Sequence, residues 1–596
     1  MAETRRLTMQ QALSQAEQAA KKGDVDFAKQ LYGAVLQKHP DHLLAKKSLR
    51  KLERDSQPNQ TRPTAQTDPP PDQMNTLLSL YNSGEMRKAE QACKKMLAIF
   101  PKAATVYSLL GATLYEQGKV EQALKIYDRA IQLKPDYAEA YNNRSIALGR
   151  LGQLEDAIKS YDKAIQLKPD YAEAHYNCGI VLKDLGQLEE AIKSYDRAIQ
   201  CKPDYAQAYN NRGIALKKFG KLEDALNSYG KAIQLKPDYA QAYYNRGTFL
   251  KDLGQLEDAI KNYDKAIQIS PKYYSARLNR SLAWLLVGNF QQGWPEYEFR
   301  FKPLKQRKPT FQQGAEWQAE PLENKKVFVY PEQGFGDIIQ FIRYLPMIKE
   351  LGGKVIFQVT KPLLRLMETF QGYDQLWSEQ HNLDASSKNN FDYHVPLLSL
   401  PGLFNTTLEN IPSASPYLSA DNKLIRMWQK RIASNELFKV GIVWAGSNTH
   451  KGDHIRSIRL SDFKVLSDIK GIKLFSLQKE KYAKWTDIDP GEVVDIDLGA
   501  EVLDFADTAA IIENLDLVVS VDTSVVHLAG ALGKEVWTLL PFSPDWRWML
   551  NRSYSPWYPT MRLFRQPSVC DWKSVLQEVR KALVERSAVM GKKVVP

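Results

Sequence analysis

The chain has 596 residues, of which 43% are hydrophobic and 25% are charged, a composition ordinary for a globular protein. At about 100 to 200 residues per domain, this length excludes a single core and predicts three or more units. The formal net charge is +12, from 81 Lys and Arg against 69 Asp and Glu, and residues 546–596 carry ten basic and three acidic side chains. A basic surface there favours an anionic partner such as a nucleotide sugar or a phosphorylated glycolipid, although a solvated charged helix is the commoner explanation.

Four cysteines lack both the paired spacing of a zinc site and the density of a secreted disulfide scaffold. The first residues carry no apolar signal core, and no apolar run approaches the roughly eighteen residues that span a bilayer. We therefore expect a cytoplasmic protein with reduced thiols, no transmembrane segment and no nucleic-acid partner. Peripheral contact with a membrane stays open.

Proline recurs every 34 residues in the first half of the chain, from Pro101 to Pro271. The segments between these prolines are alike, and a 34-residue period with this pattern resembles tetratricopeptide repeats, each a pair of antiparallel helices. In the unit from Ala206, small residues such as Gly213 let the two helices approach closely, and the aromatic ring of Tyr229 fills the gap beneath them. We expect units to begin near residues 70, 104, 138, 172, 206 and 240, with a divergent unit at 274–302.

The repeats also set the predicted domain boundaries of the first half. Residues 1–55 hold a further repeat-like unit. Residues 56–73 contain five prolines and, as their one hydrophobic residue, Ala65, which predicts a proline-rich linker. The repeat array proper is expected at residues 74–302.

An asparagine stands at the sixth place of five successive units. A side-chain amide both donates and accepts, so a row of amides along the concave face would bind an extended peptide backbone without reading its side chains. The row resembles the asparagine ladder of the O-linked N-acetylglucosamine transferase repeats, although asparagine at this place also serves packing or solubility in ordinary repeats. The predicted partner-binding residues are Asn143, Asn177, Asn211, Asn245 and Asn279.

After the array, a short strand at residues 325–330 leads into a glycine turn that opens a helix. Gly334 and Gly336 allow the tight turn, and Asp337 lies at the helix start, where capping is its simplest role. Further strands are expected at residues 354–359 and 393–396, with a helix at 361–371. Residues 303–420 therefore read as a first α/β domain.

Residues 421–596 read as a second α/β domain. Its first strand, at 438–444, ends in a turn at Gly446 and Ser447. Lys451 and Arg456 follow, so the segment offers backbone amides and cations to a pyrophosphate. No carboxylate or cysteine accompanies the nearby histidines at metal-ligand spacing, so no metal site is expected.

The stretch from Leu515 to Pro541 predicts a buried strand, a polar turn, a short helix and a second strand, one step of a doubly wound sheet. Asp522, Thr523 and Ser524 follow the first strand, and His527 lies within the first helical turn. In open α/β sheets ligands bind at this edge, whereas a plain helix cap and a locally satisfied histidine are the simpler explanation.

The segment DTSVVHLAGALGKEVWTLL is similar to the D-T-x-x-x-H-L-x-x-A-L-G segment of the heptosyltransferase-like (family 9) glycosyltransferases of GT-B architecture. The similarity extends over roughly residues 311–583, and the chain resembles bacterial proteins that join tetratricopeptide repeats to such a domain. The resemblance implies an α-solenoid followed by a GT-B-like pair of doubly wound α/β domains, with the acceptor side at 303–420 and the nucleotide-sugar donor side at 421–596.

The resemblance also implies roles for individual residues. Asp337 would be the base that deprotonates an acceptor hydroxyl, with Glu332 in reserve, and transfer would invert the anomeric carbon without a metal or other cofactor. The tryptophan-rich stretch after Pro541 would bring an arginine to a donor phosphate, or is a loop packed by its own aromatics. The implied donor-binding residues are Gly446, Ser447, Lys451, Arg456, Asp522, Thr523, Ser524, His527 and Arg547.

Two functions therefore stand against each other. The first is a glycosyltransferase that uses a nucleotide sugar and a protein, glycan or glycolipid acceptor, while its repeats bind a protein partner or the acceptor itself. The second is a non-catalytic repeat scaffold whose α/β part merely holds a ligand. The joint presence of Asp337 and the DTSVVH segment favours the enzyme.

Overall fold

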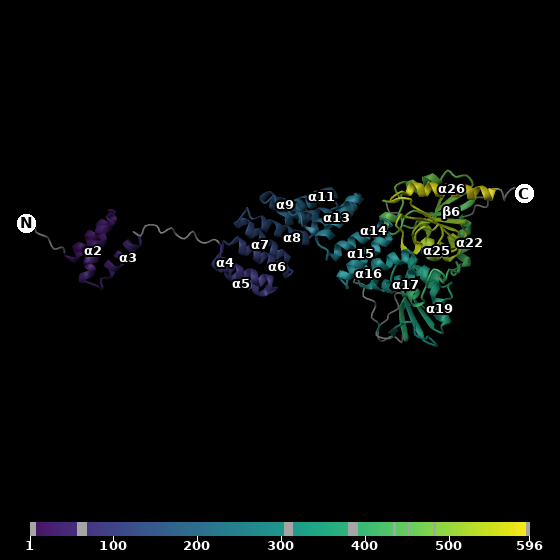
Figure 1. Cartoon of the computed structure of the whole chain (residues 1–596), viewed down its shortest axis with the longest axis horizontal. Coiled ribbons are helices and arrows are strands. Elements are labelled where there is room, and N and C mark those ends of the chain that lie inside the picture. The colour runs from purple at the N-terminus through teal and green to yellow at the C-terminus, as the bar shows by residue number, and fades with distance from the viewer. Residues whose placement is uncertain are drawn as a thin grey trace, which may run out of the picture. The chain divides into compact units, whose positions relative to one another are not determined.

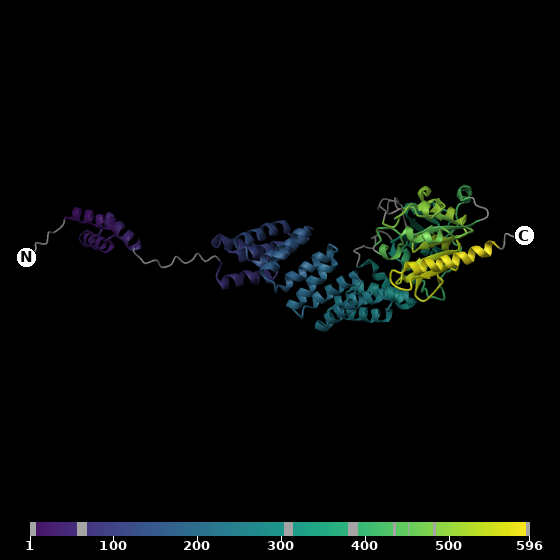
Figure 2. The same cartoon turned by 90° about the horizontal axis from the view of Figure 1, so that it is seen from above.

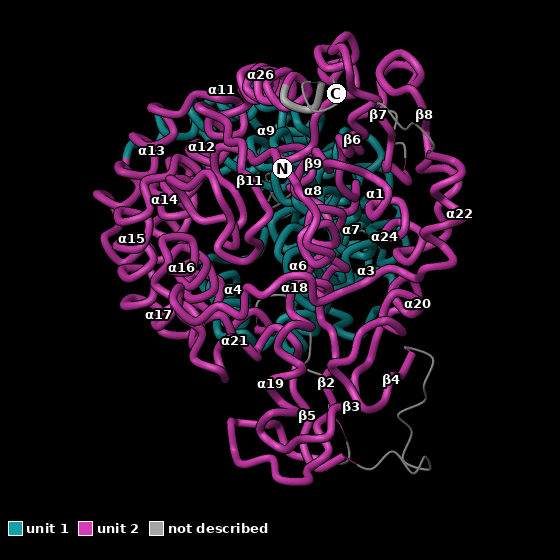
Figure 3. Tube along the Cα trace, turned by 90° about the vertical axis from the view of Figure 1, so that its right-hand side faces the viewer, with its two compact units in different colours: residues 1–203 teal, residues 204–596 magenta. Residues whose placement is uncertain are grey.

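The computed structural model describes residues 8–55, 68–302, 311, 314–378, 391–432, 437–450, 452–480 and 484–591. The chain divides into two compact units, residues 1–203 and 204–596 (Figure 3). The division falls inside the repeat array, so the second unit combines the last repeats with two β-sheets. The domain boundary predicted at residue 302 marks a different point, where the repeats end and the α/β part begins.

The described residues of the first unit form helices, and pairs of these helices recur in the repeat array with the predicted 34-residue period. Most of the predicted linker, residues 56–67, lies outside the described residues, and the next helix already begins at Pro71. The helices are α1 (Met9–Lys21), α2 (Val25–Lys38), α3 (Leu43–Asp55), α4 (Pro71–Asn82), α5 (Met86–Ile99), α6 (Ala104–Glu116), α7 (Val120–Leu133), α8 (Ala138–Arg150), α9 (Leu154–Leu167), α10 (Ala172–Asp184) and α11 (Leu188–Cys201).

The repeats continue in the second unit, and their packing confirms the predicted contact of small residues with tyrosine. A Cβ placed on Gly213 would lie 2.8 Å from Cε1 of Tyr229, which is itself buried. Only glycine therefore lets the two helices of this repeat close over the ring. These helices are α12 (Ala206–Phe219), α13 (Leu222–Leu235), α14 (Ala240–Asp252), α15 (Leu256–Ile269), α16 (Tyr274–Leu286) and α17 (Phe290–Tyr297), which runs into the 3₁₀ turn η1 (Glu298–Phe301).

The first sheet has five parallel strands in the order β1-β5-β2-β3-β4. The strands at 354–359 and 393–396 were predicted correctly, whereas the edge strands β1, of two residues, and β4, of four, were missed. The strands are β1 (Ala315–Glu316), β2 (Lys326–Tyr330), β3 (Lys354–Val359), β4 (Gln375–Ser378) and β5 (Tyr393–Pro396).

Short helices connect these strands. The helix predicted at 361–371 is only a 3₁₀ turn and one α-turn, because its Thr369 hydroxyl instead donates to the carbonyls of Leu366 and Ser419. The connecting helices are α18 (Phe335–Phe341), η2 (Ile342–Tyr344), α19 (Leu345–Glu350), η3 (Lys361–Leu363), α20 (Leu364–Met367), η4 (Leu397–Ser399) and α21 (Leu400–Leu403).

The second sheet has six parallel strands in the order β11-β10-β9-β6-β7-β8. The chain therefore builds outward in one direction from β6, then returns beside it at β9 and builds in the other direction, which is the doubly wound pattern. The strands are β6 (Phe438–Val443), β7 (Ile472–Ser476), β8 (Ile496–Asp497), β9 (Leu517–Val521), β10 (Val536–Leu540) and β11 (Met561–Arg565).

Helices cover both faces of this sheet. The long terminal helix α26 lies along its outside (Figure 2), where Val575, Val579 and Leu583 enter the core beneath it. The helices are α22 (Asn422–Ile432), α23 (Asp453–Arg456), η5 (Leu460–Leu466), η6 (Pro490–Glu492), η7 (Gly499–Glu501), α24 (Phe505–Glu513), α25 (Ser524–Ala531), η8 (Trp546–Trp548) and α26 (Trp572–Gly591).

One continuous hydrophobic core joins the last repeats to both sheets. It contains Leu285 and Phe290 from the repeats, Phe341 beside the first sheet and Trp546 and Trp557 from the second domain. Figure 1 shows α14 to α17 lying beside the α/β region. The end of the array is therefore packed rather than free, as the aromatic residues after Asn289 predict.

Two glycine substitutions in adjacent helices should have opposite effects on stability. Gly213→Ala forces the new methyl group against Tyr229 and should lower the free energy of unfolding by about 1 to 3 kcal/mol. The new methyl group of Gly230→Ala meets no atom within 4 Å, so the helix propensity of alanine should raise the free energy of unfolding by about 0.5 to 1 kcal/mol. Urea denaturation followed by circular dichroism measures both; losses of equal size would contradict the proposed packing.

Candidate functional site

The candidate donor residues meet where the order of the second sheet reverses, between β6 and β9. Nη1 of Arg456 donates to the backbone carbonyl of Asp522 at 3.1 Å, and so joins the loop after β6 to the loop after β9. A Cβ on Gly446 would lie 2.5 Å from Nη2 of Arg456, so this guanidinium needs a glycine beside it. Arg456 also has a buried Nε with no hydrogen-bond partner in the described part of the chain.

The turn after β6 offers less to an anion than the sequence predicts. The amide of Gly446 already donates to the hydroxyl of Ser457 at 3.0 Å. Ser447 is exposed and shares a 2.8 Å hydrogen bond with Thr449. Lys451 lies outside the described residues. Arg456 is therefore the cation that the described residues place at this turn.

In the polar turn after β9, Thr523 and not Asp522 caps the helix that follows. Thr523 is the N-cap of α25 and its hydroxyl accepts from the amide of Val525 at 3.3 Å, while Ser524 begins the helix. Asp522 makes no capping bond in this helix. Burial, and next to it the charge of Asp545, raise the pKa of Asp522 to about 6.

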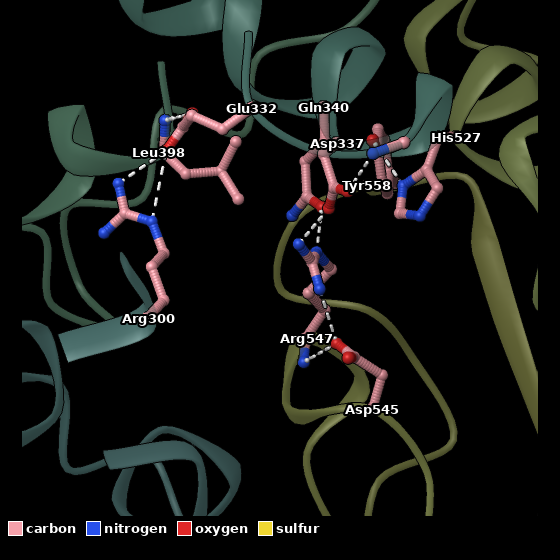
Figure 4. Close-up of polar contacts among 10 residues, drawn as sticks. Arg300, Glu332, Asp337, Gln340, Leu398, His527, Asp545, Arg547 and Tyr558 are labelled. Atoms are coloured by element: carbon pink, nitrogen blue, oxygen red, sulfur yellow. Dashed lines mark hydrogen bonds and ion pairs between the residues drawn. The ribbon is translucent and has the colours of Figure 1, made fainter. Parts of the chain in front are cut away.

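Helices α18 and α25 touch, and this contact brings the two predicted halves of the site together. A Cβ on Gly336 would lie 2.7 Å from Cδ2 of His527 and 3.5 Å from Cα of Ser524. The second glycine of the GFGD turn is therefore required by the close approach of another helix. Figure 4 shows the result, with Asp337 and His527 side by side on facing helices.

Both carboxylate oxygens of Asp337 are engaged. Oδ2 accepts from the amide of Gly334 at 3.0 Å, and Oδ1 forms an ion pair with Nη2 of Arg547. Burial raises the pKa of Asp337 above its ordinary value, and the charge of Arg547 opposes that rise.

The guanidinium of Arg547 connects three acceptors, as Figure 4 shows. Besides Asp337, its Nε donates to Oε1 of Gln340 at 2.8 Å and its Nη1 donates to Oδ1 of Asp545 at 2.7 Å. Burial alone would lower the pKa of this side chain, but Asp545 and Asp337 hold it above the ordinary value. Arg547 therefore binds carboxylates here, where the sequence predicted a phosphate contact, and Gln340 and Asp545 are site residues that the sequence analysis missed.

His527 is a buried, neutral imidazole. Its Nδ1 shares a 3.0 Å hydrogen bond with the hydroxyl of Tyr558, and its ring stacks on Trp548 at 5.2 Å between centroids. Burial, and then the charges of Arg547 and Arg343, lower its pKa well below the ordinary value. No local pattern predicts the contact with Tyr558, because the two residues are 31 positions apart and meet only through folding.

Glu332 does not lie with these residues. Its Oε1 accepts from Nη2 of Arg300 at 2.6 Å, and its Oε2 accepts from the amide of Leu398 at 3.1 Å. Arg300, at the end of the repeat array, also donates to Ser399 at 2.8 Å. This arginine thus joins the end of the array to the segments that follow β2 and β5, where the first sheet reverses its order, and Glu332 anchors the array there.

The predicted asparagines form hydrogen bonds with other polar side chains of the same and of adjacent repeats. Nδ2 of Asn245 donates to Oδ1 of Asn210 at 2.9 Å, and Nδ2 of Asn279 donates to the hydroxyl of Tyr244 at 3.2 Å. In the first unit, Asn177 and Asn143 form a similar chain through the carboxamide of the residue at position 142. Part of the amide capacity therefore serves contacts between repeats, as the packing alternative predicted.

A cavity of about 710 Å³ lies apart from Asp337 and His527, between α17, β1 and the loop after α21. It is lined by residues of these three segments, among them Trp294, Glu316 and Asn405. Across the described ranges, no cluster of three or more His, Cys, Asp or Glu side chains could hold a metal ion. Nor does any helix found in those ranges have the length and apolar character needed to cross a bilayer.

Replacing Asp522 with Asn should change stability in a pH-dependent way. The folded protein keeps the Asp522 proton to about pH 6, whereas an unfolded chain loses it near pH 3.9. Between about pH 3.9 and pH 6 the folded protein thus binds more protons than the unfolded chain. The stabilising contribution of Asp522 is therefore lost as the pH rises through 6. Asp522→Asn should be more stable relative to wild type at pH 7.5 than at pH 5, as measured by urea unfolding; the same difference at both pH values would contradict the burial of this charge.

The family models that match this chain are those of tetratricopeptide repeats. Models described as TPR repeat match residues 111–152, 147–186, 181–220 and 216–252, and a model described as tetratricopeptide repeat matches residues 240–273. Protein FlbA of Caulobacter vibrioides is 26% identical over 329 residues, which cover 51% of this chain and 54% of FlbA. The chain thus spans about half the length of this curated relative.

Two solved structures are similar over about a third of the chain. YrrB, described as a TPR protein with an unusual peptide-binding site, is 26% identical with a TM-score of 0.28, and the match covers 32% of this chain and 100% of YrrB. MamA is 26% identical with a TM-score of 0.26, over 28% of this chain and 97% of MamA. From the family models and the helix pairs together, residues 111–273 are tetratricopeptide repeats, and these repeats indicate a protein or peptide partner.

Proposed function

We propose that the α/β region is a glycosyltransferase that moves a sugar from a nucleotide-sugar donor to an acceptor hydroxyl, with inversion and without a metal. The observation that carries the proposal is the contact of α18 with α25. It unites a carboxylate from the first sheet, Asp337, with an arginine, Arg547, and a neutral histidine, His527, from the second. Strongly shifted pKa values from burial beside specific charges are typical of functional sites.

In this proposal Asp337 is the general base. Its raised pKa makes it a stronger base than an ordinary aspartate. Its Oδ1 must first leave Arg547, and an incoming diphosphate is the ligand that competes best for a guanidinium. Donor binding would therefore free the base, and Arg547 and Arg456 would offset the charge of the leaving nucleotide.

The repeats would bring a protein partner or protein acceptor to this region. Because several asparagine amides already bond between repeats, each would offer its remaining donor or acceptor capacity to a peptide. The last repeats and the candidate site share one core in the second unit, so a partner bound by these repeats would lie on the same rigid body as the site.

One observation favours the alternative of a non-catalytic scaffold. Both oxygens of Asp337 are occupied, and the ion pair with Arg547 is nearly buried, with 17% and 8% of the two side chains exposed. A permanently paired Asp337 could not act as a base. The two functions therefore differ in whether a donor breaks this pair.

Replacing Asp337 with Asn tests the base directly. Nucleotide sugars are first screened by thermal unfolding of wild type to identify the donor. A donor present at one hundred times its Kd should add about 2.7 kcal/mol to the free energy of unfolding. With that donor, Asp337→Asn should lower transfer at least about 100-fold. Its donor affinity should be retained or increased, since Arg547 loses a competing carboxylate.

The surface substitution Asp462→Asn is the matched control and should leave both quantities at wild-type values. Absence of any donor-induced shift would overturn the transferase proposal. A donor that binds but is transferred equally well by Asp337→Asn would instead remove Asp337 from the mechanism.

The class of acceptor can be tested in the repeats. Removing the amides of Asn177, Asn211 and Asn245 together should weaken a peptide acceptor at least about tenfold, at roughly 0.5 to 1.5 kcal/mol for each lost hydrogen bond. Hydrolysis of the donor should be spared, because its chemistry lies near Asp337. Transfer and hydrolysis are measured side by side; wild-type rates in both assays would exclude a peptide acceptor held by these amides.

A further inference from the structure

The loop after β10 lies between the repeat array and the candidate site. At its start, the hydroxyl of Ser543 donates to the carbonyl of Lys251 in α14 at 3.3 Å, and Phe542 lies beside Gly254. Farther along, the side chain of Met549 lies against the turn at Gly288, which has a φ of +85°. The repeats thus contact this loop at its start and again near its middle.

Trp546, in the middle of the loop, is enclosed by aromatic rings. Trp294 of α17 meets it edge-on at 5.3 Å and 88°, and Tyr297 of the same helix lies at 6.0 Å and 64°. Phe341 and Trp557 complete the enclosure at 6.3 and 6.1 Å. Trp546 is 3% exposed, so its ring has little room to turn.

The ring of Trp546 in turn supports the neighbouring guanidinium. The central carbon of Arg547 lies 4.6 Å from the centroid of Trp546 and 5.5 Å from that of Phe341. A guanidinium that stacks on an aromatic face keeps its plane, and with it the direction of its N–H groups. The orientation of Trp546 therefore sets where Arg547 points, and Arg547 points at Asp337.

Helix α17 is itself fixed against the first α/β domain. Nε1 of Trp294 donates to the carbonyl of Thr406 at 2.9 Å, and Arg300 pairs with Glu332 a turn beyond the helix end. The indole of Trp294 thus has one edge bonded to the first domain while its ring packs on the loop of the second.

We propose that Trp294 is a positioning residue for Arg547, acting through Trp546, so that the last repeat is a working part of the candidate site. The ring contacts and the ion pair carry this inference whatever reaction the site performs; only its kinetic consequence rests on the proposed function. The α/β region without α17 would then fail to hold Arg547 on Asp337.

Hydrogen–deuterium exchange of the full chain tests the positioning without any substrate. Trp294→Ala removes a ring contact on Trp546, so amides of residues 541–552 should exchange at least about tenfold faster than in wild type. Trp377→Ala is the matched control, since Trp377 is equally buried but packs on Phe328 at the far side of the first sheet. Unchanged exchange in Trp294→Ala, or the same acceleration in Trp377→Ala, would overturn the proposal.

Trp294→Phe keeps a ring and serves if the alanine variant does not fold. It loses the bond to Thr406 and part of the edge contact, so its loop should exchange at a rate between those of wild type and the alanine variant. A rate equal to wild type in a folded Trp294→Phe protein, with no folded alanine variant, would count against the proposal.

The pH profile of donor hydrolysis is the second readout. Arg547 lowers the pKa of Asp337 in the enzyme without donor, which is the state that the pH profile of kcat/KM reports. Releasing Arg547 should therefore move the acid limb of the kcat/KM profile to higher pH in Trp294→Ala and leave it in place in Trp377→Ala. Loss of rate without this shift would mean a merely structural role. If wild type hydrolyses no nucleotide sugar, the glycosyltransferase proposal fails while the exchange data still decide the positioning.

Discussion

The second unit depends on one buried cation. Arg547 has almost no exposure to water, and a charge in that position must be paired on every side that it presents. Its partners come from both halves of the α/β region: Asp337 and Gln340 lie on α18, directly after β2 of the first sheet, and Asp545 lies two residues before Arg547 in the loop after β10. These hydrogen bonds and ion pairs hold the loop after β10 against α18 and so connect the two α/β domains at the candidate site.

The repeat array takes part in the same arrangement. A solenoid normally contacts only its own neighbours along the chain, and its end needs a cap. Here the cap is the α/β region, held by the buried pair of Arg300 with Glu332 and by the aromatic contacts of α17. The array and the site therefore share a core, and a change at the last repeat reaches Arg547 through two ring contacts.

The electrostatics of the site run against stability. Burial raises the pKa of Asp337 and of Asp522 and lowers the pKa of His527, so each charged form is disfavoured in the folded protein. A fold that only had to be stable would place apolar residues there. Three such groups lie around one arginine, and perturbed pKa values of this kind cluster at functional sites, which is the basis of the proposed function.

By itself the sequence determined the local elements. The 34-residue period located the repeats because it follows from helix packing at fixed spacing, and the apolar run before Asp522 located β9 because a strand covered on both faces must be apolar. The glycine turn before Asp337 was equally readable. These features depend on neighbours along the chain.

Only the tertiary structure decided which residues meet. It paired Arg547 with Asp337 across 210 positions, bonded His527 to Tyr558, gave Glu332 to the repeat array, and drew the amides of the asparagine row into contacts between repeats. No local pattern records these choices, because a buried charge or amide selects its partner from whatever the folded chain brings within hydrogen-bond reach. Desolvation makes that selection obligatory, and it acts only once the core has closed.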